Sequence, residues 1–395
     1  MRKPAILTGQ MPSRVLPISE PTLPDLDRYA SELRGIFASR QITNGRWVAA
    51  LEEKAADLLG VPHVVALSSA TSGLVLTPKL LGWKGKVILP SFTFPATLHA
   101  LLWNNLEPVL VDCDPDTFNI DPAAVERSLA GDVCAVVPVY IFGNPPDWGA
   151  LEPLLSRHGL QSMSDAAHAL GTRLGTRAAG DFGEAEIFSL APTKVTISGE
   201  GGLVATRNEA LARDLRIARN YGNPGDYDCL FAGLNARQSE LHALLGYLSL
   251  EMTEQHVRIR EGLVERYRTG LSDLSGVRFQ KIPGGCRSTH NYFAVRIHAS
   301  SFGLSNRELQ QALDVDGIRS KIYFHPPLHR QSRFQHLPGL QGEFPNTDRV
   351  CAEVLCLPLF SHMRPDDVDE VIDTIRAIAG SAEDVRRVLA GMERP

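Results

Sequence analysis

A repeated alternation of short β-branched runs with helix-length segments constrains the fold of this chain more than any other feature. The β-branched runs are His63–Leu67, Val87–Leu89, Val109–Val111 and Ala135–Tyr140, and further short runs follow at Gln161–Ser164, Glu184–Ser189 and Leu203–Thr206. Strands that alternate with helices predict a mainly parallel sheet covered by helices on both faces. We therefore expect an α/β fold.

Before and after this alternation the pattern changes. The first 20 residues are rich in proline and predict an extended arm, and a helical pattern that Asp25 would cap runs from residue 26 to 59. Past residue 250, Glu251–Leu271 predicts one long amphipathic helix, after which strands and helices are mixed. The predicted domains are an arm at 1–20, a large α/β domain at 21–250 and a smaller α+β domain at 251–395.

Composition excludes several classes of protein. Hydrophobic residues make up 44% of the 395 residues and charged residues 22%, which excludes wholesale disorder. A formal net charge of −5 without a Lys/Arg cluster disfavours a nucleic-acid partner. No apolar run approaches the roughly 18 residues of a membrane helix. Six scattered cysteines without a C-x-x-C pair indicate neither a disulfide framework nor a metal site. The start of the chain lacks the apolar core of a signal peptide, so we expect a cytoplasmic protein.

Ligands of open α/β sheets bind beyond the carboxyl ends of the strands, and two strand ends here carry small or charged polar groups. After His63–Leu67, the turn Ser68–Gly73 offers hydroxyls and free N–H groups that suit an anion such as phosphate, although an ordinary N-cap turn has the same pattern. After Gln161–Ser164 come Asp165 and His168. A carboxylate there could hold a protonated nitrogen of a ligand; the alternative is a capping aspartate beside a core histidine.

Two further strand ends carry a lysine and an aromatic ring. Lys194 lies among apolar and small residues and is followed by Gly199–Gly202, a setting that lowers the pKa of a lysine and makes it nucleophilic. A lone lysine is otherwise most often a surface residue. Phe94, after Val87–Pro90, could offer a ring face to a flat cofactor or simply pack in the core. An anion-binding turn, a strand-end aspartate, a lysine beside glycines and an aromatic ring are together what pyridoxal phosphate requires.

The same stretches resemble the DegT/StrS-type sugar aminotransferases, which are fold-type I pyridoxal phosphate enzymes. The matching motifs are Ser164–Gly171, Phe188–Lys194 with Gly199–Gly202, Ser91–Thr97, Asp112–Pro122, Gly233–Arg237 and Leu357–Leu359. The resemblance covers the chain from about residue 40 to residue 380. It implies a large domain with a mainly parallel central sheet and a smaller C-terminal α+β domain.

The resemblance also implies a role for each matching residue. Lys194 would bind the cofactor covalently and Asp165 would pair with its protonated pyridine nitrogen. The other expected cofactor contacts are the Ala70 and Thr71 backbone and the Ser189 hydroxyl at the phosphate, His168 at the phenolic oxygen, Phe94 on the ring and, from the neighbouring subunit, Asn235. This last contact implies a homodimer with shared active sites. Family members often have Gly-Thr at residues 70–71, so the turn here must avoid a positive φ at Ala70.

The implied reaction moves an amino group from L-glutamate, through pyridoxamine phosphate, to a nucleotide-linked ketosugar. The resemblance is greatest to the branch that aminates C4 of dTDP-4-keto-6-deoxyglucose in deoxysugar biosynthesis, a part of antibiotic and other secondary metabolism. Tyr323 and His329 resemble substrate-side positions, with loop packing as the alternative. Arg219 and Arg237 are candidates for the donor carboxylate or the sugar diphosphate by charge type alone.

Other functions remain open at this point. An aminotransferase acting on a 3-keto sugar or a ketocyclitol has the same site residues. A cofactor-dependent sugar dehydratase of the same family would have a histidine in place of Lys194. A non-catalytic regulatory module with this fold would have an eroded site, whereas Lys194, Asp165, Ser189 and His168 are all present. A nicotinamide-dependent dehydratase would need a G-x-G-x-x-G motif, which the chain lacks.

Overall fold

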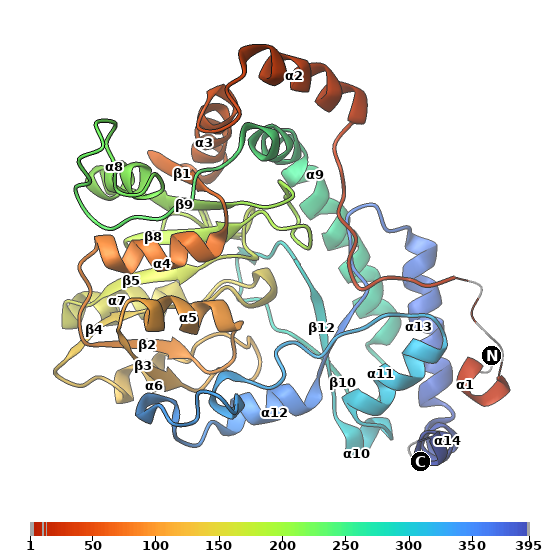
Figure 1. Ribbon diagram of the computed structural model, residues 1–395. Coiled ribbons are helices and arrows are strands. Elements are labelled where there is room, and N and C mark those ends of the chain that lie inside the picture. The colour runs from red at the N-terminus through yellow and green to blue at the C-terminus, as the bar shows by residue number, and fades with distance from the viewer. Residues whose placement is uncertain (1–3, 10–11, 13, 393–395) are drawn as a thin grey trace.

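A seven-stranded sheet forms the centre of the larger part of the molecule (Figure 1). The computed structural model describes residues 4–9, 12 and 14–392. The strands lie in the order β1-β9-β8-β5-β4-β2-β3. Their bounds are β1 His63–Leu67, β2 Lys86–Pro90, β3 Glu107–Val111, β4 Val133–Val136, β5 Gln161–Asp165, β8 Ala185–Ser189 and β9 Gly202–Thr206. All neighbours pair in parallel except β9, which is antiparallel to β1 and β8. The expected mainly parallel sheet is confirmed.

Helices cover both faces of this sheet because successive strand residues point to opposite sides. In β1, Val64 and Ala66 pack in one buried cluster, and Val65 and Leu67 pack in another. The first cluster also contains α3 (Arg46–Leu59), α6 (Pro122–Arg127) and α7 (Trp148–His158). The second contains α4 (Ala70–Leu80), α5 (Pro95–Trp103) and α8 (Glu209–Ala218), which lie together in front of the sheet in Figure 1.

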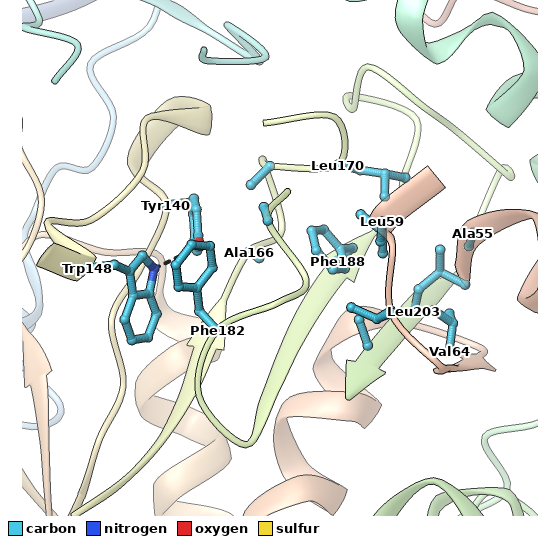
Figure 2. Packing of buried hydrophobic residues seen from close by; sticks show 14 of the residues in the cluster. Ala55, Leu59, Val64, Tyr140, Trp148, Ala166, Leu170, Phe182, Phe188 and Leu203 are labelled. Carbon is cyan, nitrogen blue, oxygen red and sulfur yellow. Dashed lines mark hydrogen bonds between the residues drawn. The ribbon is translucent and has the colours of Figure 1, made fainter. Parts of the chain in front are cut away.

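Large aromatic side chains pack beneath the strand ends where we expect the site (Figure 2). Trp148 stacks on Phe182 with ring centroids 5.0 Å apart, and its Nε1 donates a hydrogen bond to the Tyr140 hydroxyl over 2.9 Å. Phe188 of β8 and Ala166, which follows β5, are fully buried in the same cluster. This packing fills the core between the sheet and α7.

A second core surrounds a smaller antiparallel sheet of β10 (Val277–Phe279), β12 (Phe293–Ile297) and β13 (Val354–Leu357). Helices α10 (Ala299–Phe302), α11 (Asn306–Val315), α13 (Pro365–Ala379) and α14 (Ala382–Met392) lie beside this sheet in Figure 1. Further elements are α12 (Pro345–Glu353), 3-10 turns at Ile141–Gly143, Leu328–Arg330 and Pro338–Leu340, and a small sheet of β6 (Arg173–Leu174), β7 (Arg177–Ala178) and β11 (Cys286–Arg287).

One long helix, α9 (Glu240–Leu271), connects the two cores. Leu250 packs in the core of the large sheet, and Leu263 packs in that of the small sheet. The helix begins 11 residues before the predicted Glu251, where the Ser239 side chain accepts a hydrogen bond from the His242 N–H. The predicted domain boundary at residue 250 therefore falls inside a continuous helix.

Other local expectations differ from the structure in instructive ways. Within the arm, α1 (Ala5–Thr8) lies beside α14, and Leu16 belongs to the small-sheet core, so the arm packs on the C-terminal part of the chain. The helical stretch 26–59 is two helices, α2 (Leu26–Ser39) and α3, separated where Arg40 has a φ of 59°. Asp25 caps α2 as predicted, accepting from the Arg28 N–H. No helix in the described residues is long and apolar enough to cross a membrane.

Candidate active site

The candidate site residues meet at one edge of the large sheet. The carboxyl ends of β1, β2, β5 and β8 share this edge because these strands run in one direction, and β9 begins there because it runs in the other. The register places Gly202, the first residue of β9, opposite both Leu67 and Ser189. A cavity of about 360 Å³ opens at this edge. Its lining includes Ala70, Thr71, Phe94, Asp165, His168, Ser189 and Lys194.

The anion-binding turn is the N-terminus of α4. The helix begins at Ala70, inside the stretch Ser68–Gly73 expected to be a turn, and the Ser69 hydroxyl accepts from the Ser72 N–H over 3.1 Å. The N–H groups of Ala70 and Thr71 thus belong to the first turn, where free N–H groups and the helix dipole favour an anion. Ala70 has no positive φ, as its side chain requires. A Cβ on Gly202 would lie 2.3 Å from the Ala70 nitrogen, so glycine allows β9 to support this turn.

Asp165 is a buried carboxylate at the end of β5, with 5% of its surface exposed. Its Oδ2 accepts a hydrogen bond from the Thr97 hydroxyl over 2.8 Å, and its Oδ1 accepts from the Ala167 N–H over 3.2 Å. Burial raises the pKa of this carboxyl, whereas the two donors and the charge of Lys194 lower it. A carboxylate held in this way can bind a protonated nitrogen.

Lys194 lies in the loop after β8 and lines the same cavity. Burial lowers the pKa of its ammonium to about 8, and the negative charge of Asp165 partly opposes this shift. The expectation of a lysine with a lowered pKa agrees with this geometry. A lysine of this kind can act as a nucleophile and can exchange protons near neutral pH.

His168 and Phe94 also form part of the cavity wall. Burial, with the charge of Lys194 added, lowers the pKa of His168 well below its usual value, so its imidazole is neutral at pH 7. Its ring stacks on Phe142 with centroids 6.3 Å apart. Phe94 caps the N-terminus of α5 and remains 56% exposed, which leaves one ring face free for a flat ligand. The Ser189 hydroxyl accepts from the Ala191 N–H over 3.3 Å and keeps its own hydrogen to donate.

The four expected substrate residues have different positions. Tyr323 lines the cavity, and its ring centroid lies 4.8 Å from that of Tyr292. Arg237 stacks over Tyr221 and donates to the Asn220 side chain over 2.5 Å. Among the residues that the structure describes, neither Arg237 nor Asn235, which is exposed, contributes to the cavity lining.

The structure places Arg219 and His329 outside the described lining of the cavity, and each is buried and paired with a carboxylate of the protein. Arg219 is 8% exposed; its guanidinium is paired with Glu52 over 2.5 Å and donates to the Ala66 carbonyl over 2.7 Å. His329 is 7% exposed and lies between the Ser91 hydroxyl at 2.6 Å and the Asp348 carboxylate at 2.9 Å. Nη1 of Arg219 and both ring nitrogens of His329 are thus used within the protein, whereas Nε of Arg219 has no hydrogen-bond partner among the described residues.

Sequence reasoning missed part of the cavity wall. Tyr292 and Phe324 line the cavity from the C-terminal part of the chain, and no local pattern marks them, because only the tertiary fold brings them to the sheet edge. Thr93 and Thr97, which also line or adjoin the site, lie within the motif Ser91–Thr97. Their spacing of four residues at the start of a helix was the available signal.

Comparison with known proteins agrees with this geometry. Residues 26–376 match the model of the DegT/DnrJ/EryC1/StrS aminotransferase family. The dTDP-4-amino-4,6-dideoxy-D-glucose transaminase of Shigella dysenteriae is 31% identical over 91% of this chain and 98% of its own. The UDP-N-acetyl-3-dehydro-alpha-D-glucosamine 3-aminotransferase of Acidithiobacillus ferrooxidans is 31% identical over 83% of this chain and 87% of its own.

Among solved structures, DesI, crystallised in the presence of its TDP-sugar product, superposes with a TM-score of 0.91. The two sequences are 34% identical, and the superposition covers 97% of this chain and 98% of DesI. The aminotransferase TlmJ from Streptoalloteichus hindustanus superposes with a TM-score of 0.87 at 29% identity, over 93% of this chain and all of its own. Both the fold-type I architecture and the predicted resemblance are confirmed. The chain therefore belongs to the DegT/DnrJ/EryC1/StrS family of pyridoxal phosphate-dependent sugar aminotransferases.

Proposed function

We propose that this protein transfers an amino group from L-glutamate to C4 of dTDP-4-keto-6-deoxyglucose in the cytoplasm, in deoxyaminosugar biosynthesis. The observation that carries the proposal is the single cavity in which Lys194, Asp165, Phe94 and the α4 turn meet. The C4 assignment is supported by the name of the Shigella dysenteriae relative and by DesI, which was crystallised with a TDP-sugar. The 3-aminotransferase relative is the specific observation that favours a 3-keto sugar instead.

The chemistry of the cavity fits pyridoxal phosphate. A helix N-terminus with free N–H groups suits its phosphate, a buried carboxylate suits its protonated ring nitrogen, and an exposed ring face suits its flat ring. When bound, this cofactor supplies an electron sink and carries the amino group between the two half-reactions. In our proposal Ala70, Thr71 and Ser189 bind the phosphate.

The protein's own groups then bind, orient and move protons. Asp165, whose two oxygens accept from Thr97 and Ala167, holds the positive charge of the ring nitrogen. Because the pKa of Lys194 is about 8, its Nζ can take a proton from the substrate carbon and return it. His168, as a neutral imidazole, can donate a hydrogen bond to an oxygen of the cofactor. Tyr292, Tyr323 and Phe324 exclude water from the side of the small sheet.

The test is an amination assay with glutamate against dTDP-, UDP- and GDP-linked ketosugars, with the product position determined by NMR. We expect turnover with the dTDP-4-keto sugar and loss of turnover in Lys194→Ala. Amination at C3, or of a ketocyclitol in preference to the dTDP-sugar, would contradict the substrate assignment. An absorbance spectrum without a cofactor band in the wild type would contradict the role of Lys194 itself.

We also propose a homodimer in which Asn235 contacts the cofactor of the partner subunit. Its exposure, outside the cavity of its own chain, is compatible with such a contact. Inactive Lys194→Ala chains mixed with Asn235→Ala chains should then regenerate some active sites. A mixed dimer, verified by mass, that stays fully inactive would contradict the shared site.

A further inference from the structure

A chain of two threonine hydroxyls leads to the carboxylate of Asp165. Thr93 lies in the loop before α5 and Thr97 in the first turn of that helix, and each is 1% exposed. The Oγ1 atoms of Thr93 and Thr97 are 2.9 Å apart, and Thr97 Oγ1 is 2.8 Å from Asp165 Oδ2. These distances are those of O–H···O hydrogen bonds.

The direction of these hydrogen bonds follows from counting hydrogens. An ionised carboxylate only accepts, so the single hydroxyl hydrogen of Thr97 must point to Asp165. Thr97 then has lone pairs but no hydrogen left for Thr93. The Thr93 hydroxyl must therefore donate to Thr97. This order holds only while Asp165 is ionised, because a protonated carboxyl would itself offer a hydrogen.

Both oxygens of the carboxylate are thereby fixed and remain able to bind a ligand. Oδ2 accepts the hydrogen bond from the Thr97 hydroxyl, and Oδ1 accepts one from the Ala167 N–H, with 3.2 Å between the nitrogen and the oxygen. A carboxylate offers about four lone-pair sites, so capacity remains for one more donor. Hydrogen bonds to a charged acceptor strengthen when a neighbouring bond polarises the donor, as Thr93 does to Thr97.

We propose that Thr97 and Thr93 are positioning residues that keep Asp165 ionised and oriented, and thereby set the preference of the site for a protonated ring nitrogen. The inference rests on the proposed role of Asp165 as the partner of that nitrogen. It goes further by assigning the ionisation of Asp165 to a directional hydroxyl chain. Neither threonine needs to touch the reacting atoms for this role.

The test compares the binding of two ligands to the apo-protein. One is pyridoxal phosphate, and the other is its deaza analogue, in which a C–H group replaces the ring nitrogen. The preference is the ratio of their dissociation constants, measured by fluorescence titration between pH 6 and pH 8. A general loss of folding or of the phosphate site changes both constants equally and leaves the ratio unchanged.

We expect Thr97→Val to reduce this preference about 10- to 100-fold, the range for one hydrogen bond to a charged group. The reduction should grow as the pH falls from 8 to 6, because a carboxyl that has lost its donor takes up a proton at higher pH. Thr93, which also lines the cavity, makes the outer bond, and Thr93→Val leaves the bond from Thr97 to Asp165 in place, so it should reduce the preference by less, about 2- to 10-fold. Thr97→Ser keeps the hydroxyl and should retain the wild-type preference.

The matched control is Thr77→Val, which makes the same substitution in α4. Thr77 is fully buried, and its hydroxyl has no hydrogen-bond partner among the described residues, so its loss should leave the preference unchanged. Equal weakening of both ligands in Thr97→Val, or a Thr93→Val effect as large as that of Thr97→Val, would overturn the proposal. If Asp165→Asn also leaves the wild-type preference intact, the proposed role of Asp165 fails as well, which separates the two results.

Discussion

Replacing Arg219 tests whether a buried arginine serves the fold or the substrate. The sequence made Arg219 a candidate for the donor carboxylate or the sugar diphosphate, whereas the structure pairs its guanidinium with Glu52. The side chains of these residues are 9% and 11% exposed, so little water screens the pair. Glu52 also accepts from the Ala66 N–H of β1 over 2.9 Å and from Arg216 of α8 over 3.2 Å. The carboxylate thus ties α3 to β1 and α8.

The cost of Arg219→Ala can be worked out from these contacts. Removing one partner of a buried ion pair destabilises a protein by about 3–5 kcal/mol. The lower end applies here because Arg216, which is 40% exposed, still contacts Glu52. With an unfolding entropy of about 2.1 cal/mol/K per residue, a loss of about 3 kcal/mol lowers Tm by about 4 °C if the whole chain unfolds together. If only a unit of roughly 250 residues unfolds, its unfolding entropy is smaller, and the same loss lowers Tm by about 6 °C.

The assay is thermal unfolding of the apo-protein together with KM values for glutamate and the sugar. We expect Arg219→Ala to lower Tm by this amount. Both KM values should stay within about twofold of those of the wild type, since Arg219 would not contact either substrate. In a Glu52→Gln background the same substitution should cost roughly 1 kcal/mol, because the buried charge is gone. An unchanged Tm with a KM raised tenfold or more would refute the reasoning and restore Arg219 as a substrate residue.

Two further predictions concern the phosphate turn and the stability in acid. Gly202→Ala would place a Cβ 2.3 Å from the Ala70 nitrogen and should weaken pyridoxal phosphate binding at least about tenfold in a titration of the apo-protein. The control is Gly262→Ala, whose Cβ would meet nothing within 4 Å and which should bind the cofactor normally. Equal dissociation constants for the two variants would exclude a role of Gly202 in supporting the phosphate turn. Burial, with three nearby arginines, lowers the pKa of His290 to about 3, so the unfolded chain binds a proton near pH 6.5 that the folded protein rejects, and stability falls as the pH drops below that value. Urea unfolding at pH 7 and pH 5 measures how much the free energy of unfolding of the apo-protein falls between these two values. This loss should be smaller by about 2 kcal/mol in His290→Asn than in the wild type, and equal losses would contradict the lowered pKa of His290.

Local patterns predicted the strands of the large sheet because each is a short, mostly buried run between longer segments. The run Ala135–Tyr140 was too long, since β4 ends at Val136 and Pro138 lacks an N–H for a sheet ladder. The α4 turn, Asp165, Ser189 and Lys194 were found because they follow predicted strands, and a parallel sheet brings such positions to one edge. The predicted roles of these residues depend on bound groups and remain predictions.

What the sequence could not reveal was the partner of each charged or titratable side chain. Arg219 lies 167 residues from Glu52, and a residue type alone does not distinguish a guanidinium that binds substrate from one that a core carboxylate already occupies. The two cores add to this difficulty. Leu328, Leu340 and Phe344, from the predicted small domain, pack in a cluster with α4 and α5 of the large sheet. Contacts between segments so far apart in the sequence leave no periodic pattern in it.

His329 shows how a residue can serve the site without touching it. Burial is the largest influence on the pKa of His329 and lowers it, so its neutral ring carries one hydrogen at pH 7. Asp348 only accepts when ionised, so that hydrogen lies on Nε2 and points to Asp348, and Nδ1 accepts from the Ser91 hydroxyl. Ser91 follows β2 and begins the stretch that ends at Phe94. His329 thus links the segment after Tyr323 to the strand end before Phe94, and both of these aromatic residues line the cavity although His329 itself does not.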